Sequence, residues 1–141
     1  MAKTALIPDQ SALKRVGDHV RKHLATNSNA QKLPTDKAEI YAISYFMTAP
    51  ECQQMMAMID ATAKPSIAYE TDYSSGFRTS YSGNLDGHHP FVKTISDRID
   101  GILGLRADMG ETVQGQRYQV GQQFKPHNDY FHTTQNYWKE E

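Results

Sequence analysis

The sequence predicts a single α+β domain. Its 141 residues fit one domain and are enough to bury a modest core. Three stretches have apolar residues at helical spacing, and runs rich in aromatic and β-branched residues indicate strands. The expected order is helix, loop, strand, helix, loop, helix, strand, strand. The strands would therefore gather toward the end of the chain.

The first helix is expected over residues 11–25, with Ser11 as a candidate N-cap. Its narrow apolar stripe consists of Leu13, Val16, Val20 and Leu24. Residues 26–37 are polar and contain a proline, which predicts a linker or surface loop. Residues 39–47, EIYAISYFM, are rich in aromatic and β-branched residues and predict a strand.

The second helix is expected over residues 48–62. Thr48 is a candidate N-cap, Glu51 three residues later completes a capping box, and Pro50 fits the first turn. The apolar residues at helical spacing are Cys52, Met55, Met56 and Ile59. We expect this stripe to be part of the core rather than a binding surface.

The second half of the chain alternates between irregular and periodic stretches. Residues 65–89 have little periodic pattern, and GFRTSYSGNLDGHH is expected to be a long connection of a kind that is often functional. Residues 89–105 predict a third helix that stops at Gly104. Residues 112–120 predict a strand, and QQFKPHNDYF then resumes in extended form.

Composition and charge exclude several classes of protein. A net charge of -1 and a pI of about 6.6 give no reason to expect nucleic acid or a membrane surface as partner. The N-terminus has no signal-peptide pattern and no apolar run is long enough to span a bilayer. The single Cys52 cannot form an intrachain disulfide. We therefore expect a soluble, cytoplasmic protein.

A histidine and an aspartate two residues apart, His127 and Asp129, lie in the stretch RYQVGQQFKPHNDYF. In a strand, residues two apart face the same side, so an imidazole and a carboxylate would converge. These donors suit a divalent first-row metal, and two histidines with one carboxylate form the facial triad of non-heme Fe(II) oxygenases. The spacing alone also fits a surface histidine hydrogen-bonded to an aspartate. For His19 and His23, four residues apart, a solvated helix face is the better interpretation.

The residues that flank this pair make the pattern specific. They are Arg117, Tyr118, Gly121, Gln122, Phe124, Pro126, Tyr130 and Phe131. Together with His127 and Asp129 they resemble the signature of the prolyl 4-hydroxylase-like family of 2-oxoglutarate- and Fe(II)-dependent dioxygenases. EIYAISYFMTAPECQQMMAMI, GFRTSYSG and HPFVKTISDRIDGILGL also resemble segments of this family, so the similarity covers about residues 38–131.

The resemblance implies cofactors and a fold. His127 and Asp129 would be two ligands of Fe(II), and Tyr118 would contact 2-oxoglutarate, with ascorbate left open as a further cofactor. The family fold is a double-stranded β-helix, or jelly roll, of about eight strands. Residues 1–37 would be an N-terminal helix and linker, and residues 38–141 the N-terminal portion of a dioxygenase domain.

The resemblance also implies substrate contacts. Arg78 and Ser80 match the mobile loop that closes over the substrate, and Glu111 matches an acidic position at the substrate groove. The substrate would be a peptide or a small molecule that is hydroxylated at a C–H bond. The alternative for Arg78 is a solvated loop arginine, and the alternative for Tyr118 is a core aromatic.

The sequence departs from the family pattern after Asp129. The family has its second iron histidine, and the Lys or Arg that anchors 2-oxoglutarate, several strands downstream, whereas only twelve residues follow here. His132 is too close to Asp129 to be the distal ligand, and His88 and His89 are the remaining candidates on a long loop. We therefore expect a truncated copy of a longer enzyme, with two alternatives: completion by a second copy or another polypeptide, and a non-catalytic remnant.

The rival function is that of a binding module which retains half of the iron site. Its surface would be rich in aromatic side chains that could hold a partner chain at open sheet edges. These residues are Tyr69, Tyr73, Phe77, Tyr81, Tyr130, Phe131, Tyr137 and Trp138.

Overall fold

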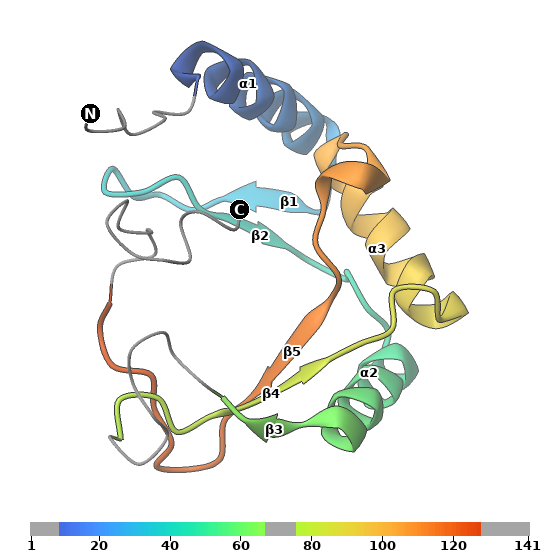
Figure 1. Cartoon of the computed structure of the whole chain (residues 1–141). Coiled ribbons are helices and arrows are strands. Elements are labelled where there is room, and N and C mark those ends of the chain that lie inside the picture. The colour runs from blue at the N-terminus through green and yellow to red at the C-terminus, as the bar shows by residue number, and fades with distance from the viewer. Residues whose placement is uncertain (1–8, 67–75, 128–141) are drawn as a thin grey trace, which may run out of the picture.

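The computed structural model of the chain describes residues 9–66 and 76–127. These residues form three helices and two small antiparallel sheets, which confirms the α+β class (Figure 1). The elements are α1 (Gln10–Thr26), β1 (Ala30–Lys32), β2 (Tyr41–Ile43), α2 (Ala49–Thr62), β3 (Lys64–Pro65), β4 (Tyr81–Asn84), α3 (Pro90–Leu103), a 3-10 turn (Ala107–Met109) and β5 (Gln114–Arg117). The strands are spread along the chain, so the prediction that they gather at its end was wrong.

Helix α1 follows the predicted range closely, but its N-cap is Asp9 rather than Ser11. The Asp9 carboxylate accepts hydrogen bonds from the backbone N–H groups of Ser11 and Ala12, which places Ser11 inside the first turn. Only Leu24 of its apolar stripe is buried, and Leu13 is 54% exposed. The helix therefore contacts the rest of the molecule mainly through its C-terminal half.

Helix α3 confirms the predicted helix and its stop. Gly104 has φ +67°, the left-handed conformation that ends a helix most easily with glycine. Val92 and Ile95 are buried, and with Leu24 and Leu85 they form the apolar core of the described residues. His19 of α1 donates from Nε2 to the carbonyl of Gly104 at 2.7 Å, so α1 is bonded to the C-terminal end of α3.

The capping box of α2 is present as predicted. The Thr48 hydroxyl accepts from the Glu51 N–H, the Glu51 carboxylate accepts from the Thr48 N–H, and Pro50 lies in the first turn. No residue of this helix is buried, and Met56 is 57% exposed. The expectation that this apolar stripe belongs to the core holds only in part, because Met55 and Ile59 are half-buried whereas Cys52 and Met56 are exposed.

Helix α2 packs on the sheet β3-β4-β5 through a pair of glycines. Gly83 and Gly115 are direct partners in the β4–β5 register. A Cβ at Gly115 would lie 2.3 Å from the Ile59 side chain, and a Cβ at Gly83 would lie 2.6 Å from the Ile59 carbonyl oxygen. The missing side chains let the helix approach the strands closely, which fixes one face of the sheet as the helix face.

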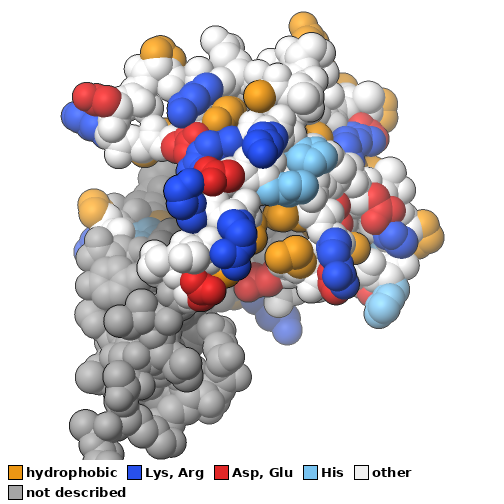
Figure 2. Space-filling model, turned by 90° about the horizontal axis from the view of Figure 1, so that it is seen from above, with side chains coloured by type: hydrophobic (Ala, Val, Ile, Leu, Met, Phe, Trp, Pro, Cys, Tyr) orange, Lys and Arg blue, Asp and Glu red, His pale blue; other side chains and the backbone are white. Residues whose placement is uncertain are grey.

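The polar segment expected to be a linker contains β1, which pairs with β2 in a hairpin. Glu39 stabilises this hairpin, since it accepts from Arg21 of α1, from Lys32 of β1 and from Tyr41 of β2. These hydrogen bonds, that of Arg21 first, hold the pKa of the Glu39 carboxyl at about 2. Figure 2 shows acidic and basic side chains interspersed over the face that includes α1, in line with such pairing.

Strand β4 lies inside the stretch that was expected to be a structureless connection. It is the central strand of the sheet order β3-β4-β5 and pairs antiparallel with both neighbours. None of the helices within residues 9–66 and 76–127 is long and apolar enough to cross a membrane.

Candidate metal and substrate site

The sheet β3-β4-β5 has a polar face on the side opposite α2. In β4, Tyr81 and Gly83 face helix α2. Side chains alternate along an extended chain, so Ser82 faces the other side. The same alternation places Ser80 and Arg78, just before the strand, on the side of Ser82. Strand neighbours follow the same rule, because directly opposite residues share a face. This polar face brings two of the residues predicted to contact substrate, Arg78 and Ser80, onto one surface.

Arg78 is bonded to a cluster of serine hydroxyls on this face. Its Nε donates to the Ser80 Oγ at 3.1 Å and its Nη2 donates to the Ser82 Oγ at 3.2 Å. Ser80 donates to the Ser66 Oγ at 3.0 Å, and Ser66 and Ser82 are bonded at 2.6 Å. Ser80 is completely buried and Ser66 is 3% exposed, so the hydroxyls hold the guanidinium in place.

Tyr118 lies on the same face. Gly115 and Arg117 of β5 point to α2, where Arg117 is ion-paired with Asp60 at 2.8 Å, so Tyr118 points the opposite way. Its side chain is 45% exposed, and its hydroxyl donates to the Gln116 Oε1 at 3.4 Å. Tyr118 is thus placed as a surface group of the polar face rather than as a core aromatic.

The segment that ends in His127 runs alongside the residues around Arg78. Thr79 donates its N–H to the Gln123 carbonyl and Lys125 donates its N–H to the Phe77 carbonyl, both at 2.9 Å. Arg78 and Phe124 are partners in an isolated antiparallel bridge. Two motifs that are about 45 residues apart in the sequence therefore meet at one place.

The His127 imidazole is oriented by a hydrogen bond to a backbone carbonyl. Its Nδ1 lies 2.7 Å from the Lys125 carbonyl, and since a carbonyl only accepts, Nδ1 is the protonated nitrogen. In the neutral ring, Nε2 then holds the lone pair, and hydrogen bonds of this kind orient histidines that bind metal ions. The donor chemistry of His127 fits a metal ion. Asp129, the second predicted ligand, lies outside the described residues.

Glu111 lies away from these groups. The end of the β4–β5 pair near Arg78 is Tyr81 opposite Arg117, and the other end is Asn84 opposite Gln114, next to Glu111. There it lines a polar pocket of about 440 Å³ with Asn84, Leu85, Thr112 and Gln114. The structure therefore brings together Arg78, Ser80, Tyr118 and His127, and it separates Glu111 from them.

The other candidate histidines have local structural partners. His89 is the N-cap of α3, and its Nδ1 accepts from the Phe91 N–H at 3.2 Å. His88 and His89 follow β4 at the end remote from Arg78. The rings of His19 and His23 are 4.5 Å apart at the α1–α3 contact, where a Cβ on Gly104 would meet the His23 ring at 2.3 Å. Within residues 9–66 and 76–127, no three His, Cys, Asp or Glu side chains gather to bind a metal.

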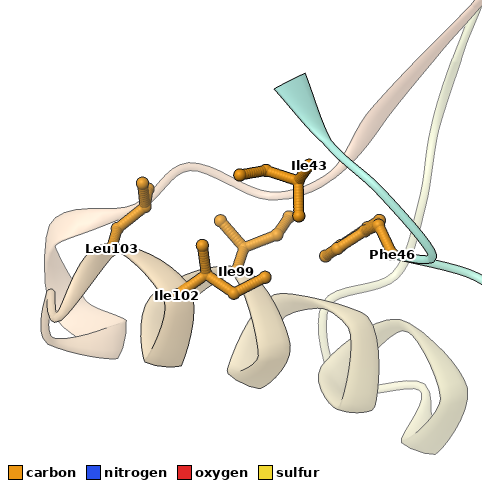
Figure 3. Close-up of a pocket in the computed structure, with 5 residues that line it drawn as sticks. All are labelled: Ile43, Phe46, Ile99, Ile102 and Leu103. Atoms are coloured by element: carbon orange, nitrogen blue, oxygen red, sulfur yellow. The ribbon is translucent and has the colours of Figure 1, made fainter. Parts of the chain in front are cut away.

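A separate apolar groove of about 310 Å³ lies between β2 and α3 (Figure 3). Ile43 and Phe46 face Ile99, Ile102 and Leu103 across it. Its lining has no titratable or metal-binding side chain, so the groove is a packing surface and not a place for chemistry.

Of the aromatic residues assigned to the rival binding surface, the structure describes Phe77 and Tyr81. Phe77 packs edge-on against Phe124, with ring centroids 5.7 Å apart, and Tyr81 lies beneath Arg117. The others lie outside the described residues.

Three residues of the site were not predicted as functional: Ser66, Ser82 and Phe124. Ser82 continues the two-residue spacing of Arg78 and Ser80, a strand signal that could have found it. Ser66 directly follows β3, and only the β3–β4 pairing brings it to Ser80.

Comparison with known proteins shows hydroxylases as relatives. The chain is 33% identical to Probable prolyl 4-hydroxylase 4 from Arabidopsis thaliana over 116 residues, which are 78% of the chain and 39% of that protein. It is 36% identical to Prolyl 4-hydroxylase 5 over 95 residues, which are 61% of the chain and 31% of the relative. It is 29% identical to Prolyl 4-hydroxylase 2 over 116 residues, which are 78% of the chain and 38% of the relative. Both of these are also from Arabidopsis thaliana.

These relatives define the class as oxidoreductases of the hydroxylase type. The chain belongs to a prolyl 4-hydroxylase-like family, which confirms the resemblance of its sequence. It spans between about a third and two fifths of the length of these relatives. No family model matches the chain, and no solved structure matches it significantly.

Proposed function

We propose that the chain provides part of the active site of a 2-oxoglutarate- and Fe(II)-dependent dioxygenase that hydroxylates a C–H bond. His127 and Asp129 would be two iron ligands, and Tyr118 would bind 2-oxoglutarate. The strands would be the first strands of a jelly-roll core. A peptidyl proline is the substrate suggested by the names of the relatives. A free amino acid or another small molecule would fit the same chemistry.

The observation that supports this proposal most directly is the hydrogen bond from His127 Nδ1 to the Lys125 carbonyl. A bond of this kind favours the tautomer in which Nε2 carries the lone pair that a metal ion would need. Arg78, Ser80 and Tyr118 lie on the neighbouring polar face, where a polar substrate and cosubstrate could be held.

Each residue of the proposed site has a distinct role. His127 and Asp129 would hold the metal, and the Tyr118 hydroxyl would hold a carboxylate oxygen by a hydrogen bond. Arg78 would present a fixed cation toward the substrate, with Ser80 and Ser82 keeping it oriented. When bound, iron and 2-oxoglutarate would supply the activation of O2 and the oxidation of the C–H bond.

The experiment that tests this proposal is a titration of the chain with Fe(II) under anaerobic conditions, followed by NMR of the histidine side chains. Paramagnetic broadening should begin at His127, and it should be lost in His127→Ala and strongly weakened in Asp129→Ala. His19→Ala/His23→Ala is the matched control, because it removes a pair of histidines whose rings lie 4.5 Å apart. Broadening that survives His127→Ala, or that disappears with the His19/His23 variant, would contradict the proposal.

Turnover provides the second test. In a version of the chain completed with the missing strands, conversion of 2-oxoglutarate to succinate should require Fe(II) and O2, and His127→Ala or Asp129→Ala should abolish it. Turnover that survived both changes would exclude this mechanism.

A second candidate, a module completed by another copy of the chain, is supported by the open edges of the sheet. β5 is an edge strand of the order β3-β4-β5 within the described residues, and the apolar groove lies open beside β2. The solution mass as a function of protein concentration distinguishes the two candidates. A dimer that binds Fe(II) more tightly than the monomer would favour completion by a second copy, and a monomer at all concentrations would exclude it.

A further inference from the structure

Phe124 joins two groups of the site through its ring. The ring is stacked on the His127 imidazole, with centroids 3.6 Å apart and planes inclined by 23°. The Arg78 guanidinium carbon lies 4.7 Å from the centroid of the same ring, within the range of a cation–π contact. Phe77 meets Phe124 and His127 edge-on, at 5.7 Å and 6.4 Å. The imidazole therefore belongs to a packed group of rings rather than to an isolated loop.

Arg78 forms the fixed base of this stack. Its guanidinium makes two directional hydrogen bonds, to Ser80 and Ser82, and still presents a flat surface to Phe124. A lysine could not do both, because its ammonium is a point charge without a planar face. Two serines of the cluster beneath, Ser66 and Ser80, are buried, so the position of Arg78 is set by the sheet itself.

Two contacts of the His127 imidazole constrain its orientation. Lys125, two residues earlier, donates its backbone N–H to the Phe77 carbonyl, which holds this segment beside Arg78. The Nδ1 bond to the Lys125 carbonyl and the ring stack then both act on the imidazole itself.

We propose that Phe124 and Arg78 are positioning residues that set the orientation of the His127 imidazole for metal binding. They act through His127 by stacking and do not themselves bind the metal. This inference rests on the proposed function for the role of the metal, but the ordering of the ring can be measured without any metal.

The test compares four variants. Phe124→Leu removes the ring and keeps an apolar side chain, while Phe124→Tyr keeps the ring. Arg78→Lys keeps the charge and removes the planar group. Phe46→Leu is the matched control, because Phe46 also lies under an arginine, Arg98, with the guanidinium carbon 5.7 Å from its ring.

Two measurements are made on each variant. Long-range nitrogen–proton NMR spectra of the metal-free chain report the tautomer of His127, and a Co²⁺ titration reports metal affinity. We expect Phe124→Leu to mix the two tautomers and to weaken Co²⁺ binding by about ten- to a hundredfold, the usual effect of losing an outer-shell partner. Arg78→Lys should change both measurements in the same direction by less. Phe124→Tyr and Phe46→Leu should match the wild type.

The outcomes separate the positioning role of Phe124 and Arg78 from the proposed metal site. A wild-type tautomer in both Phe124→Leu and Arg78→Lys would overturn the positioning role. If Phe124→Leu unfolds the chain, Arg78→Lys decides alone, because it leaves the ring packing intact. Mixed tautomers in Phe124→Leu together with no Co²⁺ binding by the wild type would support the positioning of the ring and overturn the proposed metal site.

Discussion

Two arginines lie over phenylalanine rings in different regions of the molecule, and different groups hold them. Arg98 of α3 lies over Phe46 and makes two hydrogen bonds to the carboxylate of Glu51, at 2.6 and 3.2 Å. Arg78 lies over Phe124 and is held by the neutral hydroxyls of Ser80 and Ser82. Within the described residues, no carboxylate is ion-paired with Arg78.

Under the proposed function, this difference separates a structural arginine from one that contacts the substrate. Glu51 compensates the charge of Arg98, and the pair connects the start of α2 to α3, because Glu51 is also part of the α2 capping box. Among the described residues, hydroxyls orient the guanidinium of Arg78 without neutralising it, and in our proposal its positive charge faces the substrate. Substitutions around each arginine should therefore change different properties.

The largest effect on stability is expected at Gly115, in the sheet that supports Arg78. An added methyl in Gly115→Ala would meet three atoms of Ile59 at 2.3 to 2.7 Å. Overpacking of this kind should lower the free energy of unfolding by about 1–3 kcal/mol, as measured by urea denaturation. Gly101→Ala in α3 is the control, since nothing lies within 4 Å of its Cβ and the helix should gain up to about 1 kcal/mol. Equal stability of the two variants would contradict the close packing of α2.

The next effect is expected at Ser80, beneath Arg78. Ser80→Ala removes a buried hydroxyl that bonds to both Arg78 and Ser66, and it should lower the free energy of unfolding by about 1–2 kcal/mol. Thr94→Ala on the exposed side of α3 is the control and should change it by less than about 0.5 kcal/mol. If Ser80→Ala were as stable as the control, the hydroxyl cluster would not hold Arg78.

The ion pair between Arg98 and Glu51 should make the free energy of unfolding depend on pH. The hydrogen bond of Arg98 to Glu51, followed by that of the Thr48 N–H, lowers the pKa of the Glu51 carboxyl from 4.5 to about 2. A carboxyl whose pKa is lower in the folded state stabilises the fold above its unfolded pKa. This contribution is lost as the pH falls from about 4.5 to about 2.

Glu51→Gln should therefore reduce the loss of stability over this window, as followed by thermal unfolding at several pH values. Glu39 has a pKa of about 2 as well, so the dependence should become shallower again in Glu51→Gln/Glu39→Gln. Gln53→Ala, on the exposed surface of α2, should keep the wild-type slope. A wild-type slope in the double variant would show that the two carboxylates are not paired in the folded state.

The smallest effect on stability is expected at Tyr118 on the polar face. Its hydroxyl makes one long hydrogen bond to Gln116, so Tyr118→Phe should change the free energy of unfolding by less than about 0.5 kcal/mol. Binding of 2-oxoglutarate, measured by calorimetry in the presence of Mn²⁺, should weaken in the same variant. Unchanged binding would remove Tyr118 from the proposed site.

Local signals in the sequence were sufficient for much of the fold. The capping box at Thr48 and Glu51 and the stop at Gly104 were predicted because they depend on residues a few positions apart. The pattern around His127 and Asp129 also identified the family, because it is a contiguous motif. Strands β1 and β4 were missed, since three- and four-residue strands are too short to show a period.

The sequence by itself therefore determined the helices, the family and the residues expected to bind a metal. Tertiary structure alone decided that Gly83 and Gly115 admit α2, that Ser66 supports Arg78, and that Phe124 stacks on His127. It also decided that Glu111 lies at the other end of the β4–β5 pair. These outcomes depend on contacts between residues distant in the chain, and the register of strand pairing that creates such contacts is not encoded in any single local pattern.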